Sequence, residues 1–233
     1  MRIWLHRSVG DETGWNAWCL DLLGFATWAS SEEAVLGRVL KKVEEHLGWL
    51  VSHGLPQATW SGGLEVVERV SGDEVLFSVD RMAVAAEKVD AAIKLLKASR
   101  EDLLKTLEHV PEAALDWDPP YSSFAPWASW RTIRQVLAHI ANTETHYYLS
   151  KIGCEPVGSP VHGDEDWREF LVRHRVETID RLHELRATGD LRRVRGHPDD
   201  EWSVSKVLRR LVRHEILHRK SISRIVAEFQ RRV

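Results

Sequence analysis

Apolar residues recur with two different periods along the chain, and the change falls near residue 80. Before that point, the short runs RIWLHRS (2–8) and WNAWCLDL (15–22) contain aromatic or β-branched residues and flank the turn-like VGDETG. Runs of this kind predict two strands. The run LEVVERV (64–70) has the same character and predicts a third strand.

A helical pattern separates the second and third of these strands. Apolar residues recur every three or four positions from Val35 to Leu50, which is the period of a helix with one buried face. Ser30 and Glu33 have the spacing of a capping box, and Gly54 stands where a glycine commonly ends a helix. The order β-β-α-β predicts a small α+β module over residues 1–79.

From residue 80 onward the strand pattern stops and helical periods take over. The pattern predicts four long helices, at 82–110, 130–153, 166–189 and 203–233, joined by Pro-, Gly- or charge-rich connections. Four such helices are typical of a four-helix bundle. We therefore predict an α+β protein of two domains, residues 1–79 and 80–233, with the boundary at Val79–Asp80.

Composition narrows the class of protein but does not name an activity. The chain is 43% hydrophobic and 29% charged, as globular proteins are, and its net charge of −3 argues against a polyanion binder. Cys19 and Cys154 are too few and too far apart for a disulfide scaffold or a cysteine metal site. No run reaches the ~18–20 apolar residues of a membrane span. We expect a soluble, cytoplasmic protein.

The last predicted helix carries the chemistry that stands out. His214 and His218 are four residues apart within HEILH, so on a helix both rings lie on one face and can meet one metal ion. Apolar residues continue the same face on either side of the pair: Val204, Val207, Leu211, Ile222 and Ile225. The pair therefore points into the bundle, where a metal, a carboxylate or a water network has to satisfy it.

HEILH also matches the HExxH pattern of many metalloproteases, but its context argues against that reading. Only 15 residues follow His218, and they continue the same helix. Position 224 is arginine, where one protease class has its third histidine, and Glu228 lies roughly 15 Å further along the helix. A short pattern with two free positions matches often by chance.

The third ligand is expected from an earlier helix. His139 lies at the edge of the buried face of helix 130–153, and a bundle can bring that helix beside the last one. Three neutral histidines suit Zn²⁺, Ni²⁺ or Fe²⁺ and leave a position open for water or substrate. His146 shares the face of His139 but lies about 10 Å further along, so we place it in a surrounding shell or substrate pocket.

Other candidates near the metal face have two readings each. Glu215 is either a general base or a solvated or salt-bridged carboxylate, and we favour the second. Arg213 could anchor an anionic substrate, and Trp130 could line the mouth of the metal pocket. The remaining histidines, including His109, His174 and His183, are expected at the surface or its boundary. Tryptophans gather in two groups, for which packing is the alternative to a dimer face or a pocket mouth: Trp4, Trp15, Trp18 and Trp28, and Trp117, Trp127 and Trp130.

The stretches VPEAALDW, WRTIRQVLAHIANTE and HEILHRKSISRI occur in an order and spacing that resembles the DinB-like superfamily of metal-binding four-helix bundles. The resemblance covers residues 80–233. It implies a divalent metal held by His139, His214 and His218. Relatives of this kind include thiol-dependent S-transferases, in which the metal activates a low-molecular-weight thiol, and hydrolases that use metal hydroxide. The chain departs from many relatives in having RKS after His218.

The stretch GWNAWCLDLLGFATWASSEEAVLGRVLKKVEEHLGWL is similar to the HicB-like fold of toxin–antitoxin antitoxins, although the family's two prolines are missing around Leu20–Gly24. Such modules usually mediate binding or assembly. The first hypothesis is therefore a metal-dependent transferase or hydrolase with a small-molecule substrate, whose catalytic residues are unknown. The alternative is a non-catalytic, metal-stabilised binding or regulatory protein that assembles through the HicB-like module. The basic residues of the last helix fit either a local phosphate- or carboxylate-binding patch or a solvated face, and we favour the solvated face. We therefore expect no nucleic-acid partner, and we expect a homodimer and no membrane partner.

Overall fold

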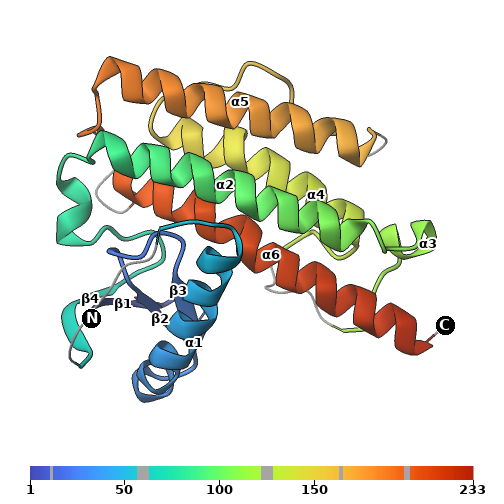
Figure 1. The fold of residues 1–233 in the computed structure, drawn as a ribbon, viewed down its shortest axis with the longest axis horizontal. Coiled ribbons are helices and arrows are strands. Elements are labelled where there is room, and N and C mark those ends of the chain that lie inside the picture. The colour runs from blue at the N-terminus through green and yellow to red at the C-terminus, as the bar shows by residue number, and fades with distance from the viewer. Residues whose placement is uncertain (11–12, 57–62, 122–127, 163–164, 197–199, 233) are drawn as a thin grey trace.

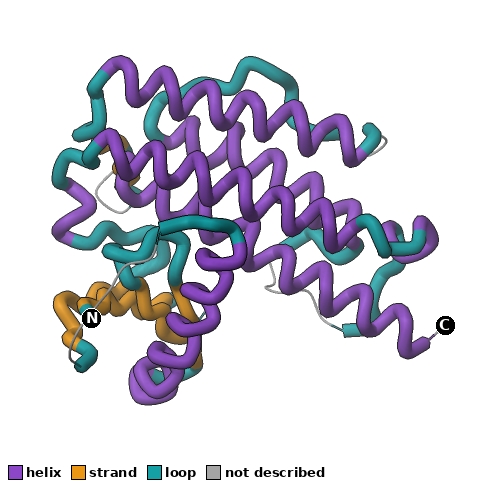
Figure 2. The backbone as a smooth tube through the Cα atoms, viewed as in Figure 1, coloured by secondary structure: helices purple, strands orange, loops and turns teal. Residues whose placement is uncertain are grey.

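The computed structural model describes residues 1–10, 13–56, 63–121, 128–162, 165–196 and 200–232. A sheet and one helix form the N-terminal part, and a bundle of long helices forms the rest (Figure 1). The α+β class predicted from the sequence is confirmed: a four-stranded sheet lies in the first third of the chain, and a short two-stranded ladder precedes the last helix (Figure 2). Among the helices of the described segments, none combines the length and the hydrophobicity that a bilayer span requires.

The N-terminal sheet has four strands in the order β3-β2-β1-β4. The first three are antiparallel neighbours, whereas β4 lies parallel to β1 because helix α1 carries the chain back across the sheet. Strand β3 is an addition to the predicted β-β-α-β order. The bounds are β1 (Arg2–Ser8), β2 (Gly14–Trp18), β3 (Ala26–Ala29), α1 (Glu32–Ser52) and β4 (Glu65–Ser71).

Helix α1 covers one face of this sheet. Its N-cap is Ser31, whose hydroxyl accepts a hydrogen bond from the backbone N–H of Ala34, so the predicted start at Ser30 is wrong by one residue. Gly54 takes the left-handed φ of +63° just after the helix ends, as predicted. The side chains of Val35, Val39 and Val43 form the buried face of α1 and are fully inaccessible to solvent.

The other face of the sheet carries the buried tryptophans. Trp4 and Trp18 are buried together with Ala26 and Phe77, which confirms the packing reading for these two tryptophans. Trp28, on β3, is 48% exposed and does not belong to this cluster.

The helical region is a four-helix bundle in which α2 contacts α6, α6 contacts α4, α4 contacts α5, and α5 contacts α2. The helix after residue 130 changes character at its middle, from an α-helix to the π-helical segment η2. The sequence pattern missed this change, the short helix α3 and the small ladder formed by β5 and β6. The bounds are α2 (Ala86–Leu107), α3 (Glu112–Leu115), α4 (Ile133–Asn142), η2 (Thr143–Leu149), α5 (Trp167–Thr188), β5 (Val194–Arg195), β6 (Trp202–Ser203) and α6 (Val204–Arg232).

Local signals explain where the bundle helices begin and end. Thr132 caps α4 in a capping box with Gln135. Asp166 caps α5 by accepting backbone hydrogen bonds, and Gly189 ends that helix with a φ of +69°. These caps fix the helix positions that the site depends on.

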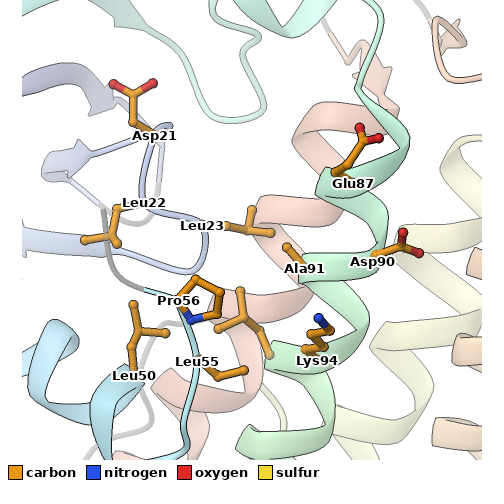
Figure 3. A pocket seen from close by; sticks show the side chains of 11 residues that line it. Asp21, Leu22, Leu23, Leu50, Leu55, Pro56, Glu87, Asp90, Ala91 and Lys94 are labelled. Atoms are coloured by element: carbon orange, nitrogen blue, oxygen red, sulfur yellow. The ribbon is translucent and has the colours of Figure 1, made fainter. Parts of the chain in front are cut away.

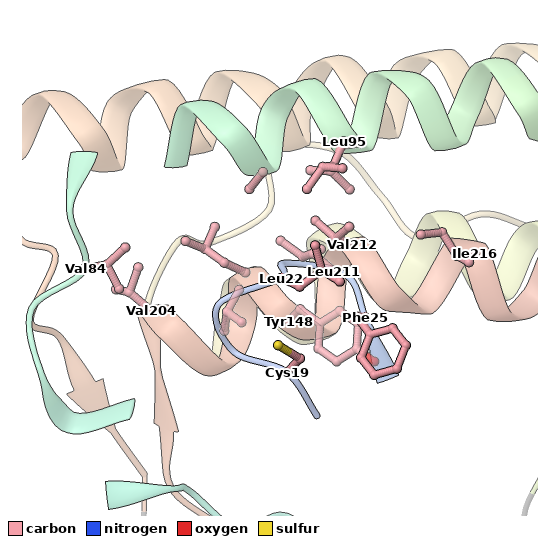
Figure 4. Close-up of a cluster of buried hydrophobic side chains, with 14 of the residues drawn as sticks. Cys19, Leu22, Phe25, Val84, Leu95, Tyr148, Val204, Leu211, Val212 and Ile216 are labelled. Atoms are coloured by element: carbon pink, nitrogen blue, oxygen red, sulfur yellow. The ribbon is translucent and has the colours of Figure 1, made fainter. Parts of the chain in front are cut away.

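The two regions share one core. Leu22 and Phe25 of the N-terminal part pack in the same buried cluster as Leu211 and Val212 of α6 (Figure 4). Gly24 lies so close to α6 that a Cβ there would stand 2.6 Å from a Val212 methyl carbon, and its φ is +84°. Only glycine suits both conditions, so this turn is fitted to the bundle.

The predicted boundary at Val79–Asp80 falls within the short 3₁₀ helix η1 (Ser78–Arg81). The buried carboxylate of Asp80 accepts hydrogen bonds from the backbone of Phe77 and from Arg209 of α6. The junction is thus a packed, charge-paired element.

Candidate metal centre

Three histidines from two helices meet inside the bundle. His139 comes from the last turn of α4, and His214 and His218 come from the middle of α6. One ring nitrogen from each lies within 4.8 Å of the others. The Nε2 atoms of His139 and His214 are 3.0 Å apart. The three residues singled out in the sequence are therefore neighbours in space.

The sequence places these rings by simple means. The apolar stripe of α6 is buried along its length, with Leu211 and Ile222 at 1% and 0% exposure on either side of the histidine pair. His214 and His218 fill the gap in that stripe, and their ring centroids are 4.4 Å apart. Thr143 is the first residue after α4. Its hydroxyl lies 3.3 Å from Nδ1 of His139, and this contact orients the imidazole ring.

Burial sets the charge of the three rings. It lowers the pKa of His139 to about 4 and, with help from the neighbouring His139, that of His218 to about 3. The pKa of His214 also falls well below its ordinary value, for the same reason. At neutral pH all three rings are uncharged and can offer lone pairs.

The donor set fits a divalent ion. Two nitrogens that each lie ~2.0–2.1 Å from one Zn²⁺ are separated by roughly 3–3.5 Å, which agrees with the 3.0 Å found between His139 and His214. The same distance suits a neutral N–H···N hydrogen bond. However, the buried Nδ1 atoms of His214 and His218 have no hydrogen-bond partner in the described part of the chain, so these residues alone do not satisfy the cluster.

Trp130 forms one wall of the cluster. Its ring stacks on His139 with centroids 3.5 Å apart and an interplanar angle of 15°, and its edge meets His218. On another side, the buried Tyr148 ring meets His214 edge to face at 5.5 Å. Aromatic surfaces therefore enclose the nitrogen donors.

Comparison with known families decides the identity of the helical region. A family model described as the DinB superfamily matches residues 95–222, more than half of the chain. The chain belongs to the DinB superfamily. The match covers α4 and the part of α6 up to Ile222, so it includes all three histidines, and the DinB superfamily is generally metal-binding. No curated protein and no solved structure matches the chain.

Glu215, which completes the HExxH pattern, makes no hydrogen bond with the three histidines but belongs to a separate network of buried ion pairs. Its two carboxylate oxygens accept hydrogen bonds from Ser99, Arg100 and Arg175. Burial opposes its ionisation, but the two guanidinium groups outweigh burial and hold its pKa below the ordinary value. Glu215 is therefore a salt-bridged carboxylate, as favoured from the sequence, and it is buried rather than solvated.

The network extends to Glu144 of η2, which accepts hydrogen bonds from Arg100, Arg175 and Thr178. The sequence did not predict this network, because its members come from four helical segments that are far apart in the chain. The sequence does contain one indication that Arg100 is buried. Arg100 follows Leu96 by four residues and precedes Leu103 by three, so it lies on the buried stripe of α2.

His146 lies in another cluster. Its Nε2 is 3.1 Å from the carbonyl oxygen of Gly158, and its Nδ1 is 2.8 Å from the hydroxyl of Thr145. The same hydroxyl is 2.9 Å from Nδ1 of His174, which is only 1% exposed, so the expected surface position of His174 is wrong. His174 stands on the buried face of α5, three residues after Leu171.

Arg213 and the remaining tryptophans of the loop group occupy other places. Arg213 lines a groove between α1 and α6, and burial lowers its pKa to about 10. Trp117 packs edge to face on Phe229 at 5.6 Å. Trp127 lies outside the described residues.

A larger hollow of about 380 Å³ lies between α2 and the N-terminal loops (Figure 3). Its floor is apolar, with Leu22, Leu55 and Leu95 among the lining residues, and Asp21 and Glu87 stand at its edge. No pattern in the sequence predicts this hollow, because its two walls come from segments more than thirty residues apart.

Proposed function

We propose that the chain is a divalent-metal-dependent enzyme whose three ligands are His139, His214 and His218, and that its reaction is the transfer of a low-molecular-weight thiol. The observation that carries the proposal is the cluster of three neutral histidines, in which one ring nitrogen of each lies within 4.8 Å of the others and two buried Nδ1 atoms have no partner among the described residues. Three protein ligands leave a position open for an exogenous group, which is the arrangement of catalytic rather than structural sites.

Exposure of the site supports catalysis over a purely structural role. His139 and His214 are partly exposed, whereas His218 is buried, so a solute can approach one side of the cluster. A bound divalent ion would supply Lewis acidity, which lowers the pKa of a thiol or a water molecule that reaches it.

The surroundings favour a thiol over a water-dependent reaction. Glu215 is held by Arg100 and Arg175 and has no hydrogen bond to a triad histidine within the described segments. A thiol gives up its proton far more readily than water and needs less help from a general base. The role of this chain's own residues would be to hold the donor nitrogens, through Thr143, and to present an apolar aromatic wall, through Trp130.

The first test is metal analysis of protein made without a histidine tag. We expect about one equivalent of Zn²⁺, Ni²⁺ or Fe²⁺, lost in His214→Ala and in His139→Ala. His183→Ala is the matched control, because His183 is exposed on α5. A wild-type chain that folds but takes up no stoichiometric metal would overturn the proposal.

The second test is a transfer assay of the metal-loaded chain with glutathione, bacillithiol or mycothiol and an electrophilic aryl halide. We expect thioether formation that depends on both the metal and the thiol. Ester hydrolysis without any thiol would instead identify a hydrolase. A chain that binds a full equivalent of metal but shows neither activity would favour the non-catalytic hypothesis. In that hypothesis the predicted HicB-like module mediates assembly, and the predicted homodimer is the expected assembly.

A further inference from the structure

A groove between α1 and α6, on the side of α6 away from the histidine cluster, gathers positive charge. It has a volume of about 160 Å³. Its charged and titratable lining residues come from both helices: Lys42, Glu45 and His46 of α1, and Arg213, Arg219 and Lys220 of α6. The groove thus joins the N-terminal module to the bundle.

Two of the four cations are already paired. Lys42 donates to Glu45 at 2.6 Å, and Arg219 forms an ion pair with Asp102 of α2. The side chains of Arg213 and Lys220 make no hydrogen bond or ion pair with any residue in the described part of the chain. Two unpaired charges therefore face one small groove.

Of these two residues, Arg213 gives the stronger evidence for a bound anion. Its side chain is half-buried, yet its guanidinium has five N–H donors and no described acceptor. A charged group removed from water is costly unless it is paired. His46, which lines the same groove, is neutral at pH 7 because burial, with Arg213 and Lys220 nearby, lowers its pKa to about 4, so it does not add to the charge.

The position of Arg213 separates this groove from the candidate metal centre. Successive residues on a helix point ~100° apart, so Arg213 and His214 lie on different faces. His214 faces α4, whereas Arg213 faces α1.

We propose that this groove binds a phosphate group, either free phosphate or the phosphomonoester end of a small molecule. Two unpaired cations match a dianion, and a phosphate carries about −1.5 to −2 charges at pH 7. Arginine presents a planar fork of donors that suits phosphate oxygens, and lysine adds a point charge. The volume is well below the roughly 300–1,000 Å³ of pockets that enclose a drug-sized ligand, so it suits an anionic group and not a whole nucleotide.

Calorimetric titration of the full chain with inorganic phosphate, at low ionic strength and after metal removal, tests the proposal. We expect saturable binding that weakens at least tenfold in Arg213→Gln and in Lys220→Gln. Arg224→Gln is the matched control, since Arg224 is an exposed arginine on the same helix and does not line the groove. Lys220 is also exposed, so its variant is expected to fold even where Arg213→Gln does not.

The arms of the titration separate the sources of the anion. Tighter binding of phenyl phosphate than of inorganic phosphate identifies the end of a small molecule, and equal binding identifies free phosphate. The proposal is wrong if phosphate gives no saturable heat, if acetate binds as well as phosphate, or if the variants and their control bind equally. His214→Ala is expected to keep the phosphate affinity, so failure here is distinct from failure of the metal proposal.

Discussion

Two polar clusters lie side by side in the bundle, and they differ in how their buried polar groups are paired. In one, Arg100 and Arg175 bind Glu144 and Glu215, all four nearly inaccessible to water. In the other, the contacts of the three histidines within the described residues are with each other, Thr143 and aromatic walls. The charges of the first cluster are paired with one another, whereas two buried nitrogens of the second have no hydrogen-bond partner among the described residues.

The contrast is sharpest at two consecutive residues of α6. Glu215 belongs to the ion network, and His214 belongs to the histidine cluster. Because neighbouring residues on a helix point in different directions, a single turn of α6 serves both. The HExxH pattern therefore combines residues of two separate units in this chain. The network is a structural unit that joins four helix segments, whereas the three histidines form a cluster whose donor set fits a divalent ion.

The largest expected effect concerns the network. Glu215→Ala leaves Arg100 and Arg175 to share Glu144 as their one remaining carboxylate partner among the described residues, and an uncompensated buried charge typically costs 3–5 kcal/mol. We expect a loss of about that size in the free energy of unfolding, measured by urea denaturation. Glu228→Ala is the control, because its partners Arg231 and Arg232 are exposed and we expect less than about 1 kcal/mol. A Glu215 variant as stable as that control would mean that the network is not structural.

The second effect separates the triad from the network by its dependence on a ligand. A divalent ion that binds only the folded chain should raise its free energy of unfolding by about 2.7 kcal/mol at a concentration 100 times Kd. We expect this gain in the wild type and in His183→Ala, and none in His214→Ala, as followed by Tm with and without added metal. An equal gain in His214→Ala would place the ion elsewhere.

Much of the fold could be predicted because long helices carry a repeated signal. The stripe from Val204 to Ile225 on α6 spans several turns and defines the buried face without any tertiary information. Strand β3 has four residues, and the paired strands β5 and β6 have two each. Elements this short have no period to detect, and they exist because a distant segment pairs with them.

The two polar clusters differ in the same way. His214 and His218 could be predicted as a pair because their spacing is local, and His139 followed from the edge of a buried helix face. Arg100 and Arg175 come from two helices that meet Glu144 and Glu215 only after the bundle has assembled. Their pairing is a tertiary fact, although the position of Arg100 on an apolar stripe marks it as buried.

A third effect follows from the uncharged state of the triad in the metal-free chain. Unfolded histidine has a pKa near 6.5, whereas burial lowers the pKa of His139 to about 4 and that of His218 to about 3. As pH falls below 6.5, the unfolded chain binds protons that the folded chain does not, so stability is lost progressively between pH 6.5 and about 4. Each histidine contributes at most about 1.4 kcal/mol per pH unit.

Urea midpoints of the metal-free chain at pH 7, 6 and 5 measure this slope. We expect His139→Gln/His218→Gln to have a shallower slope than the wild type, and His183→Gln to match the wild type. The slope should not vanish in the double variant, because burial also lowers the pKa of His46 and His174. Identical slopes in all three proteins would show that the triad is not held neutral by burial.

The smallest expected effect tests whether the wall of the triad contributes to its affinity. Trp130 stacks on His139, and an aromatic stack is worth about 0.5–1.5 kcal/mol beyond simple burial. We expect Trp130→Ala to weaken metal affinity by about two- to tenfold, measured by competition with a chromophoric chelator, and Trp130→Phe to recover most of the loss. Trp117→Ala is the matched control, since Trp117 packs on Phe229, and its affinity should equal that of the wild type. If Trp130→Ala binds metal as tightly as this control, the histidines alone set the affinity, because the tryptophan then neither orients His139 nor shields it from water.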